Sequence, residues 1–109
     1  MKIQTGCLYL ANLNPSFGSE INKERPVLVI QKESAIRRTV IILPISSKKI
    51  TQPKIECLLK KDKTNNLYTD SIVILDQIRA IDKRRLIGEI GKVDSKIYNQ
   101  IISRLKNIF

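Results

Sequence analysis

The sequence predicts a mainly β domain with some helix (α+β), built as a small, strongly curved antiparallel barrel with one C-terminal α-helix. Two observations support this prediction. Short apolar runs separated by turn residues fill most of the chain, and near its end the hydrophobic period becomes helical. At 109 residues the chain has the length of one domain, which we expect to span residues 1–109 without a linker.

Runs of β-forming residues mark the expected strands. Pro26 opens the second strand, where its missing N–H is tolerated. The third does not alternate, so we expect burial on both faces, whereas the fourth alternates and is expected to be half exposed. The fifth continues through residues 77–81 past a bend at Asp76. The predicted strands span residues 7–11, 27–30, 39–43, 54–59 and 71–75.

The last segment has the period of an amphipathic helix. Asp94 is a good N-cap residue, because its carboxylate can accept from the first backbone N–H groups. Apolar residues then fall on one helical face, which must cover a sheet or a partner. They are Ile97, Ile101, Leu105 and Ile108.

The chain is strongly basic. Lysine and arginine outnumber aspartate and glutamate by 20 to 10, a formal net charge of +10. Such a chain attracts polyanions at long range and loses that attraction as salt rises, so nucleic acid is the first partner to consider. The alternative is that the excess lysine only keeps the surface soluble.

Cysteine and histidine content limits the metal chemistry. Cys7 and Cys57 form no CxxC motif and the chain has no histidine, so we expect no metal centre built on sulfur or imidazole. We also expect no cofactor. Both cysteines lie in apolar or alternating runs, as free cysteines do in a reducing cytoplasm. The longest apolar run, residues 40–43, is too short to cross a bilayer, so we expect a cytoplasmic protein with no membrane partner.

The loop before the second strand has the composition of a binding site. Asn14 begins a turn with the proline after it, and Gly18 permits a backbone angle that other residues resist. The loop can therefore fold back and present Phe17, Ser19 and Glu20 together. An exposed aromatic ring there suits a base of single-stranded RNA. The alternatives are that Phe17 plugs the end of the barrel and that Glu20 pairs with a lysine rather than a base.

Arg25 follows this loop at the start of the second strand. Its fixed donors could hold a phosphate and stabilise charge growing on a pentacoordinate phosphorus. It could also be a surface arginine paired with Glu24 or Glu20.

Two further clusters follow buried strands. We expect the hydroxyls of Ser46 and Ser47 to emerge at a strand end, where they could donate to the same phosphate or simply belong to a turn. Asp76 interrupts an apolar run, so it is either a bulge residue facing solvent or a polar group of a site, and Gln77 beside it could bind a base edge. The basic run 83–85 is a weaker indication, since charge runs are usually solvated.

Taken together these motifs resemble the MazF/PemK toxins, a family of RNA-cutting enzymes. The resemblance spans nearly the whole chain and rests on the order GxxYLAxLNPxxGSExxxxRPVLVIQ, then PISS, then DSIVxLDQIRxxDKxRL. It implies an SH3-like barrel that forms homodimers. It also implies an endoribonuclease that cuts single-stranded RNA (mRNA) at short sequences without a metal, leaving 2′,3′-cyclic phosphate and 5′-hydroxyl ends, and a cognate antitoxin that silences it.

The resemblance also assigns residues. It makes Arg25 the leading catalytic residue and places Ser46 where the family commonly has a threonine, with Asp76 at an acidic position that some members use. Cys7 replaces a common acidic residue and Ile74 an arginine of the PemK-type branch, and the second departure favours chemistry centred on Arg25. The implied RNA-binding residues are Asn14, Phe17, Gly18, Ser19, Glu20, Ser47, Gln77 and Arg79.

The chemistry needs a base and an acid, and arginine, with a pKa above about 12, is a poor base near neutrality. Arg25 is therefore expected chiefly to stabilise charge and is the candidate acid, with Glu20 or Asp76 as candidate base. Two rival functions remain at this stage. One is an RNA-binding module that does not cut. The other is a gyrase-inhibiting toxin of the same fold, but those relatives rely on a tryptophan-containing tail and this chain has no tryptophan.

Overall fold

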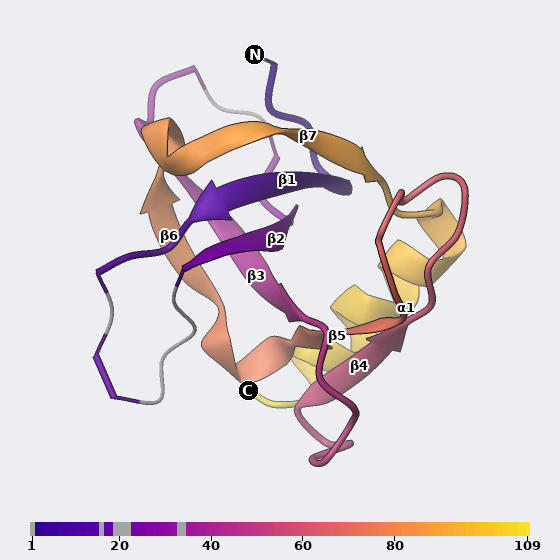
Figure 1. Cartoon of the computed structure of the whole chain (residues 1–109). Helices are drawn as coiled ribbons and strands as arrows, with labels where there is room; N and C mark the ends of the chain where they lie inside the picture. The colour runs from indigo at the N-terminus through magenta and orange to yellow at the C-terminus, as the bar shows by residue number, and fades with distance from the viewer. Residues whose placement is uncertain (1, 16, 19–22, 33–34) are drawn as a thin grey trace.

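A curved antiparallel sheet with one α-helix against it forms the structure, a computed structural model that describes residues 2–15, 17–18, 23–32 and 35–109 (Figure 1). Two short 3-10 turns, η1 (Leu75–Gln77) and η2 (Lys83–Arg85), flank one of the strands. The helix is α1 (Ser95–Lys106). The strands in the described residues are β1 (Cys7–Asn12), β2 (Glu24–Val29), β3 (Thr39–Ser46), β4 (Glu56–Leu59), β5 (Ser71–Ile74), β6 (Arg79–Asp82) and β7 (Leu86–Lys92).

The strand order is β4-β5-β3-β2-β1-β7, and β6 pairs with β3 beside this path. Within the part of the chain that the structure describes, no ladder joins β4 to β7, so the sheet curves strongly without closing. Helix α1 lies at the β4 and β5 side (Figure 1). Arg104 of the helix donates to the carbonyl oxygen of Glu56 at 2.9 Å and fixes this arrangement. The predicted mainly β fold with a C-terminal helix is confirmed, as an open barrel.

β3 extends three residues beyond the predicted end because it changes partner along its length. Its outer edge pairs first with β6 and then, at Ile45 and Ser46, with β5. The carbonyl of Ile41 accepts from the N–H of Ile30, so the backbone groups of Ile41 face β2. The backbone groups of successive residues face alternate edges of a strand, so the backbone nitrogen of Pro44 faces the outer edge, at the point where the partner changes from β6 to β5. The missing N–H of proline therefore costs no ladder bond. Ile41 is exposed, so burial on both faces holds only for the second half of the strand.

β7 was not predicted as a strand. Gly88 and Gly91 weaken its β propensity, and a basic run precedes it. The strand forms because it pairs with β1, with register shifts between Leu8 and Tyr9 and between Leu10 and Ala11.

The two faces of the sheet bury separate apolar clusters. Along β1, Leu8 belongs to the cluster beneath α1 and Tyr9 to the cluster on the opposite face, as strand alternation requires. Ile101 and Leu105 of the helix are buried, and the Asp94 side chain accepts from the N–H of Lys96 at 3.2 Å, so the predicted cap and apolar face are confirmed. In the described residues no helix is long and apolar enough to cross a membrane.

Candidate active site

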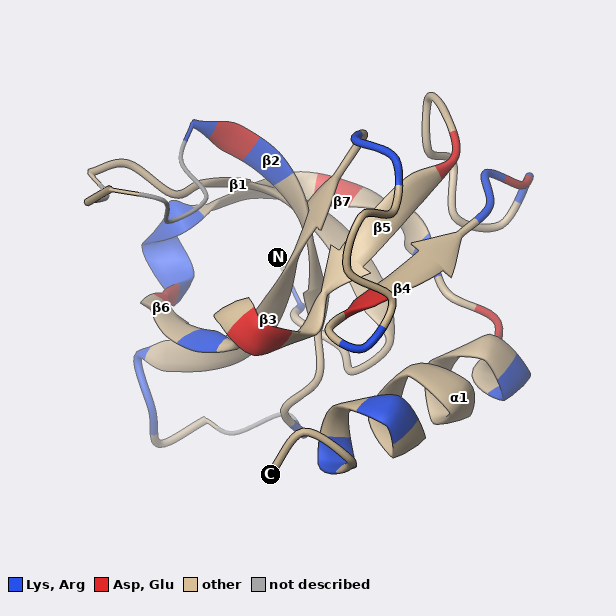
Figure 2. Ribbon diagram, turned by 90° about the horizontal axis from the view of Figure 1, so that it is seen from below, with Lys and Arg blue, Asp and Glu red and all other residues tan. Residues whose placement is uncertain are grey.

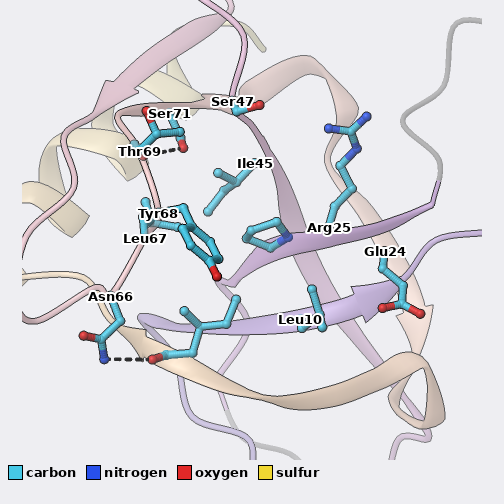
Figure 3. Close-up of a pocket in the computed structure, with 12 residues that line it drawn as sticks. Leu10, Glu24, Arg25, Ile45, Ser47, Asn66, Leu67, Tyr68, Thr69 and Ser71 are labelled. Atoms are coloured by element: carbon cyan, nitrogen blue, oxygen red, sulfur yellow. Dashed lines mark hydrogen bonds between the residues drawn. The ribbon is translucent and has the colours of Figure 1, made fainter.

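A pocket of about 530 Å³ opens beside Arg25 (Figure 3). We call it the Arg25 pocket. Its apolar lining comes from Leu10, Pro26, Ile45, Leu67 and Ile90. Its polar and aromatic lining comes from Glu24, Arg25, Ser47, Asn66, Tyr68, Thr69 and Ser71.

Arg25 is half-buried in β2, opposite Ala11 of β1. The ladder between β2 and β3 ends at the pair Val27 and Pro44. Continued by two residues, the same register sets Arg25 opposite Ser46 at the end of the two strands. In Figure 3 the guanidinium of Arg25 extends to the same side of the pocket as Ser47. A strand therefore positions the cation, and two hydroxyl-bearing residues lie at the end of the neighbouring strand.

The two serines are placed differently. Ser46 is the last residue of β3 and only 1% exposed, and its Oγ accepts from the N–H of Lys48 at 3.3 Å. Ser47 is exposed and lines the Arg25 pocket. The prediction that both hydroxyls emerge at the strand end is wrong for Ser46, because β3 continues through that residue and successive side chains of a strand point to opposite faces.

The β1–β2 loop carries a second group of predicted residues. Gly18 has φ of 57°, which confirms the expected left-handed conformation. Phe17 is 83% exposed, so it does not plug the end of the barrel. Ser19 and Glu20 lie outside the described residues. Phe17 and Gly18 are absent from the described lining of the Arg25 pocket.

The base of this loop is held by hydrogen bonds that the sequence did not predict. The Oδ1 atom of Asn14 accepts from the N–H of Lys23 at 3.0 Å, and the N–H of Leu13 donates to the carbonyl of Lys23. From the far end of the chain, Arg85 donates through Nη1 to the carbonyl oxygens of Asn12 and Asn14. Asn14, predicted to bind RNA, thus closes the loop.

The basic run 83–85 is not uniformly solvated. Arg84 forms an ion pair with Asp82 at 3.0 Å on the surface, and its side-chain hydrogen bonds lower the pKa of Asp82 to about 2. Arg85 serves the β1–β2 loop, although 71 residues separate it from Asn14. The sequence contains no local signal for this contact.

The third predicted cluster lies outside the Arg25 pocket. Asp76 is exposed and Gln77 half-buried in η1, the turn that connects β5 and β6. Arg79 begins β6 and pairs with Ile42 of β3. Arg79 therefore lies on the outer edge of β3, the strand that also carries Ser46, and Asp76 and Gln77 lie in the turn that precedes it.

Sequence reasoning missed the fourth contributor, the loop between β4 and β5. The sequence predicts only a connection between strands 54–59 and 71–75 here, yet Leu67, Tyr68 and Thr69 line the Arg25 pocket. The hydroxyl of Ser71 donates to the carbonyl of Thr69 at 2.9 Å and holds the end of this loop (Figure 3). The available signal was Tyr68, an aromatic residue two positions after the polar residues 61–66.

Basic side chains are spread over the molecule. Figure 2 shows lysine and arginine on β2, on β6, on several loops and along α1, with acidic residues between them. The net charge therefore attracts a polyanion from many directions, and local geometry must fix where it binds.

Comparison with known proteins identifies the family. A family described as PemK-like, MazF-like toxin of type II toxin-antitoxin system matches residues 4–109. The chain belongs to this family. The toxin is also 35% identical to Endoribonuclease EndoA of Bacillus subtilis over 109 residues, which cover 97% of this chain and 93% of that one.

Solved structures share the fold of this toxin. MazF from Deinococcus radiodurans has a TM-score of 0.84 at 21% identity, covering 99% of this chain and 96% of its own. An endoribonuclease in complex with its cognate antitoxin, from a mycobacterial species, has a TM-score of 0.75 at 19% identity and covers 96% and 92% of the two chains. The family match confirms the resemblance to the MazF/PemK toxins, and the expectation of an endoribonuclease agrees with the name of the Bacillus relative.

Proposed function

We propose that this toxin is an endoribonuclease that cuts single-stranded messenger RNA at short sequences without a metal ion. The main observation in support is Arg25, which lies on a rigid strand at the wall of an open pocket. Unpaired bases expose both faces and their hydrogen-bonding edges, so a pocket with apolar and polar lining suits single-stranded RNA better than a duplex.

In the proposed reaction the ribose 2′-oxygen attacks the adjacent phosphorus and the bond to the 5′-oxygen breaks. The 2′-hydroxyl proton passes to a base, and the departing 5′-oxygen receives a proton from an acid. The products are a 2′,3′-cyclic phosphate and a 5′-hydroxyl. Charge that builds on the phosphorane oxygens is stabilised by the guanidinium of Arg25, whose donors are fixed in a plane. We assign the orientation of the phosphate to Ser46, at the end of the neighbouring strand, which requires its buried hydroxyl to become accessible when RNA binds.

The proton acceptor is a carboxylate in this proposal. Glu20 is one candidate, and Asp76, exposed on η1, is the other. Comparing pH–rate profiles of Glu20→Gln and Asp76→Asn with the parent decides between them. The variant that removes the base loses the acidic limb of the profile. If both variants keep that limb, neither carboxylate is the base.

The partners are part of the proposal. We infer a homodimer, because a small sheet with open edges gains from a second copy, and a cognate antitoxin, because family members are so paired and a structural neighbour is solved with its antitoxin. With mRNA as substrate the toxin acts in the cytoplasm. Sedimentation at micromolar concentration tests the dimer, and a monomer there contradicts it.

The decisive experiment incubates the purified toxin with a long RNA in excess EDTA. We expect discrete fragments with cyclic phosphate ends, and Arg25→Ala should lower the rate about 100-fold. Arg84→Ala, which removes an equal charge from a surface ion pair, is the matched control. Protection of the RNA without cutting would instead favour a binding module, and turnover by Arg25→Ala close to the parent rate would overturn the assignment.

A further inference from the structure

Tyr68 is a fully exposed aromatic residue at the wall of a pocket. Its side chain is 100% exposed, yet it lines the Arg25 pocket together with its neighbours Leu67 and Thr69. Figure 3 shows its ring over the hollow, with Ile45 behind it and Arg25 on the other side. The ring is fully exposed, so a flat partner can reach it.

The backbone that carries Tyr68 is fixed by a buried asparagine. Asn65 is only 1% exposed, and its Oδ1 atom accepts from the N–H groups of Asp62 and Leu67, both at 3.0 Å. Its Nδ2 atom donates to the carbonyl of Lys60 at 2.8 Å. The Asn65 side chain therefore binds three points of the loop, and one of them, Leu67, is next to Tyr68.

The same loop is attached to β7. The N–H of Lys92 donates to the carbonyl of Thr64, and the side chain of Asn66 donates to the carbonyl of Ile90, both at 3.0 Å. These bonds hold the residues on either side of Asn65 against a strand of the sheet. The exposed ring is thus mounted on ordered backbone, and binding a ligand does not have to order the loop first.

An exposed ring on a preordered loop is suited to stacking. Aromatic side chains stack on bases of single strands with little regard to sequence, because every base has a π face. Paired bases in a duplex already stack on each other and do not offer that face. A phosphate bound at Arg25 would leave the attached nucleoside within the same pocket as the ring.

We propose that Tyr68 stacks on a nucleobase next to the phosphate bound by Arg25, and so adds affinity for single-stranded RNA. This rests on the proposed function, because it assumes RNA in the Arg25 pocket. Tyr68 supplies binding and no proton, so its removal should act on KM rather than on kcat.

The first test uses a fluorescent reporter. The chain has no tryptophan, so Tyr68→Trp provides a single one at this position. A short 2′-O-methyl oligoribonucleotide of mixed sequence lacks the attacking hydroxyl and remains uncut. We expect strong, saturable quenching of Tyr68→Trp and little quenching of Phe109→Trp, a control at an aromatic residue that is 84% exposed at the chain end. Equal quenching of both, or none of Tyr68→Trp, overturns the proposal.

The second test measures cleavage. We expect Tyr68→Ala to raise KM about tenfold, and Tyr68→Phe to restore it, because stacking needs the ring and not the hydroxyl. If the parent cuts RNA and Tyr68→Ala has the same KM as the parent, the stacking role is refuted and the proposed function is not. A parent that cuts no RNA refutes the proposed function, while the quenching experiment still reports on Tyr68.

A third test measures the oligomeric state of Tyr68→Ala by sedimentation. We expect the same oligomeric state as the parent. Conversion to a smaller species would assign the ring to an interface between two copies of the chain, and quenching by an acidic peptide but not by the oligoribonucleotide would assign it to a protein partner. Either result overturns the stacking proposal.

Discussion

The guanidinium of Arg85 donates to the backbone carbonyl of Asn12 at 3.1 Å, across 73 residues of sequence. The same Nη1 atom donates to the carbonyl of Asn14. A residue directly before β7 thereby holds residues 12–14, at the start of the loop that leaves β1.

We expect Arg85→Ala to weaken RNA binding about fivefold, corresponding to about 1 kcal/mol for hydrogen bonds from a charged donor in a partly exposed place. The loop then has to be ordered during binding instead of beforehand. Fluorescence anisotropy with the uncut 2′-O-methyl oligoribonucleotide measures the affinity. Arg84→Ala removes an equal charge without touching the loop, so equal losses in both variants would attribute the effect to charge alone.

Gly91 and Gly88 lie in the same strand and offer a matched pair of substitutions. A β-carbon at Gly91 would lie 2.5 Å from the carbonyl oxygen of Asn65, whereas one at Gly88 would meet no atom within 4 Å. We expect Gly91→Ala to lower the free energy of unfolding by about 2 kcal/mol. Thermal unfolding should then shift down by roughly 10 °C. Gly88→Ala should unfold near the parent temperature, and similar shifts in the two variants would show that the close approach is unimportant.

We expect substitutions of Ser46 and Ser47 to affect different kinetic constants. Because we propose that Ser46 orients the phosphate, Ser46→Ala is expected to lower kcat about tenfold, as loss of a hydrogen bond to a charged group would. Ser47 lines the pocket, and Ser47→Ala should act mainly on KM. Ser46→Thr keeps the hydroxyl and should recover most of the rate. Steady-state kinetics on one RNA substrate checks this, and a loss of kcat confined to Ser47→Ala would transfer the role to Ser47.

The ion pair of Asp82 and Arg84 predicts a pH dependence. Hydrogen bonds from Arg84 lower the pKa of Asp82 from 3.8 to about 2, so the folded state favours the ionised carboxylate. Its contribution to stability is therefore complete above pH 3.8 and disappears as the pH falls toward about 2. Urea unfolding of the parent and Asp82→Asn should differ at neutral pH and converge near pH 2. A constant difference across this range would show that the carboxylate charge is not responsible.

Local patterns were sufficient for most of the elements. Asp94 and the apolar period after it predicted a helix that the structure contains, because capping and amphipathicity are properties of neighbouring residues. Turn chemistry likewise predicted the positive φ of Gly18. Arg25 stood out through its place between a loop and a strand, and the structure puts it in the wall of a pocket.

Other features depended on contacts distant in the sequence. β7 contains two glycines and forms only because β1 lies beside it. Ser46 is buried because β3 pairs with β5 at its end, after pairing with β6 at its start. No local sequence pattern predicts this change of partner. Tyr68 reaches the Arg25 pocket because Asn65 and β7 hold its loop.

The sequence by itself therefore determined the fold class, the helix and the family, since these follow from residue types, short-range periodicity and motif order. Only the tertiary structure decided which hydroxyl faces the pocket, what holds the β1–β2 loop and that Tyr68 borders the site. The physical reason is that strand pairing joins residues far apart in the chain, and a shift of one residue in a strand reverses which side chain faces solvent.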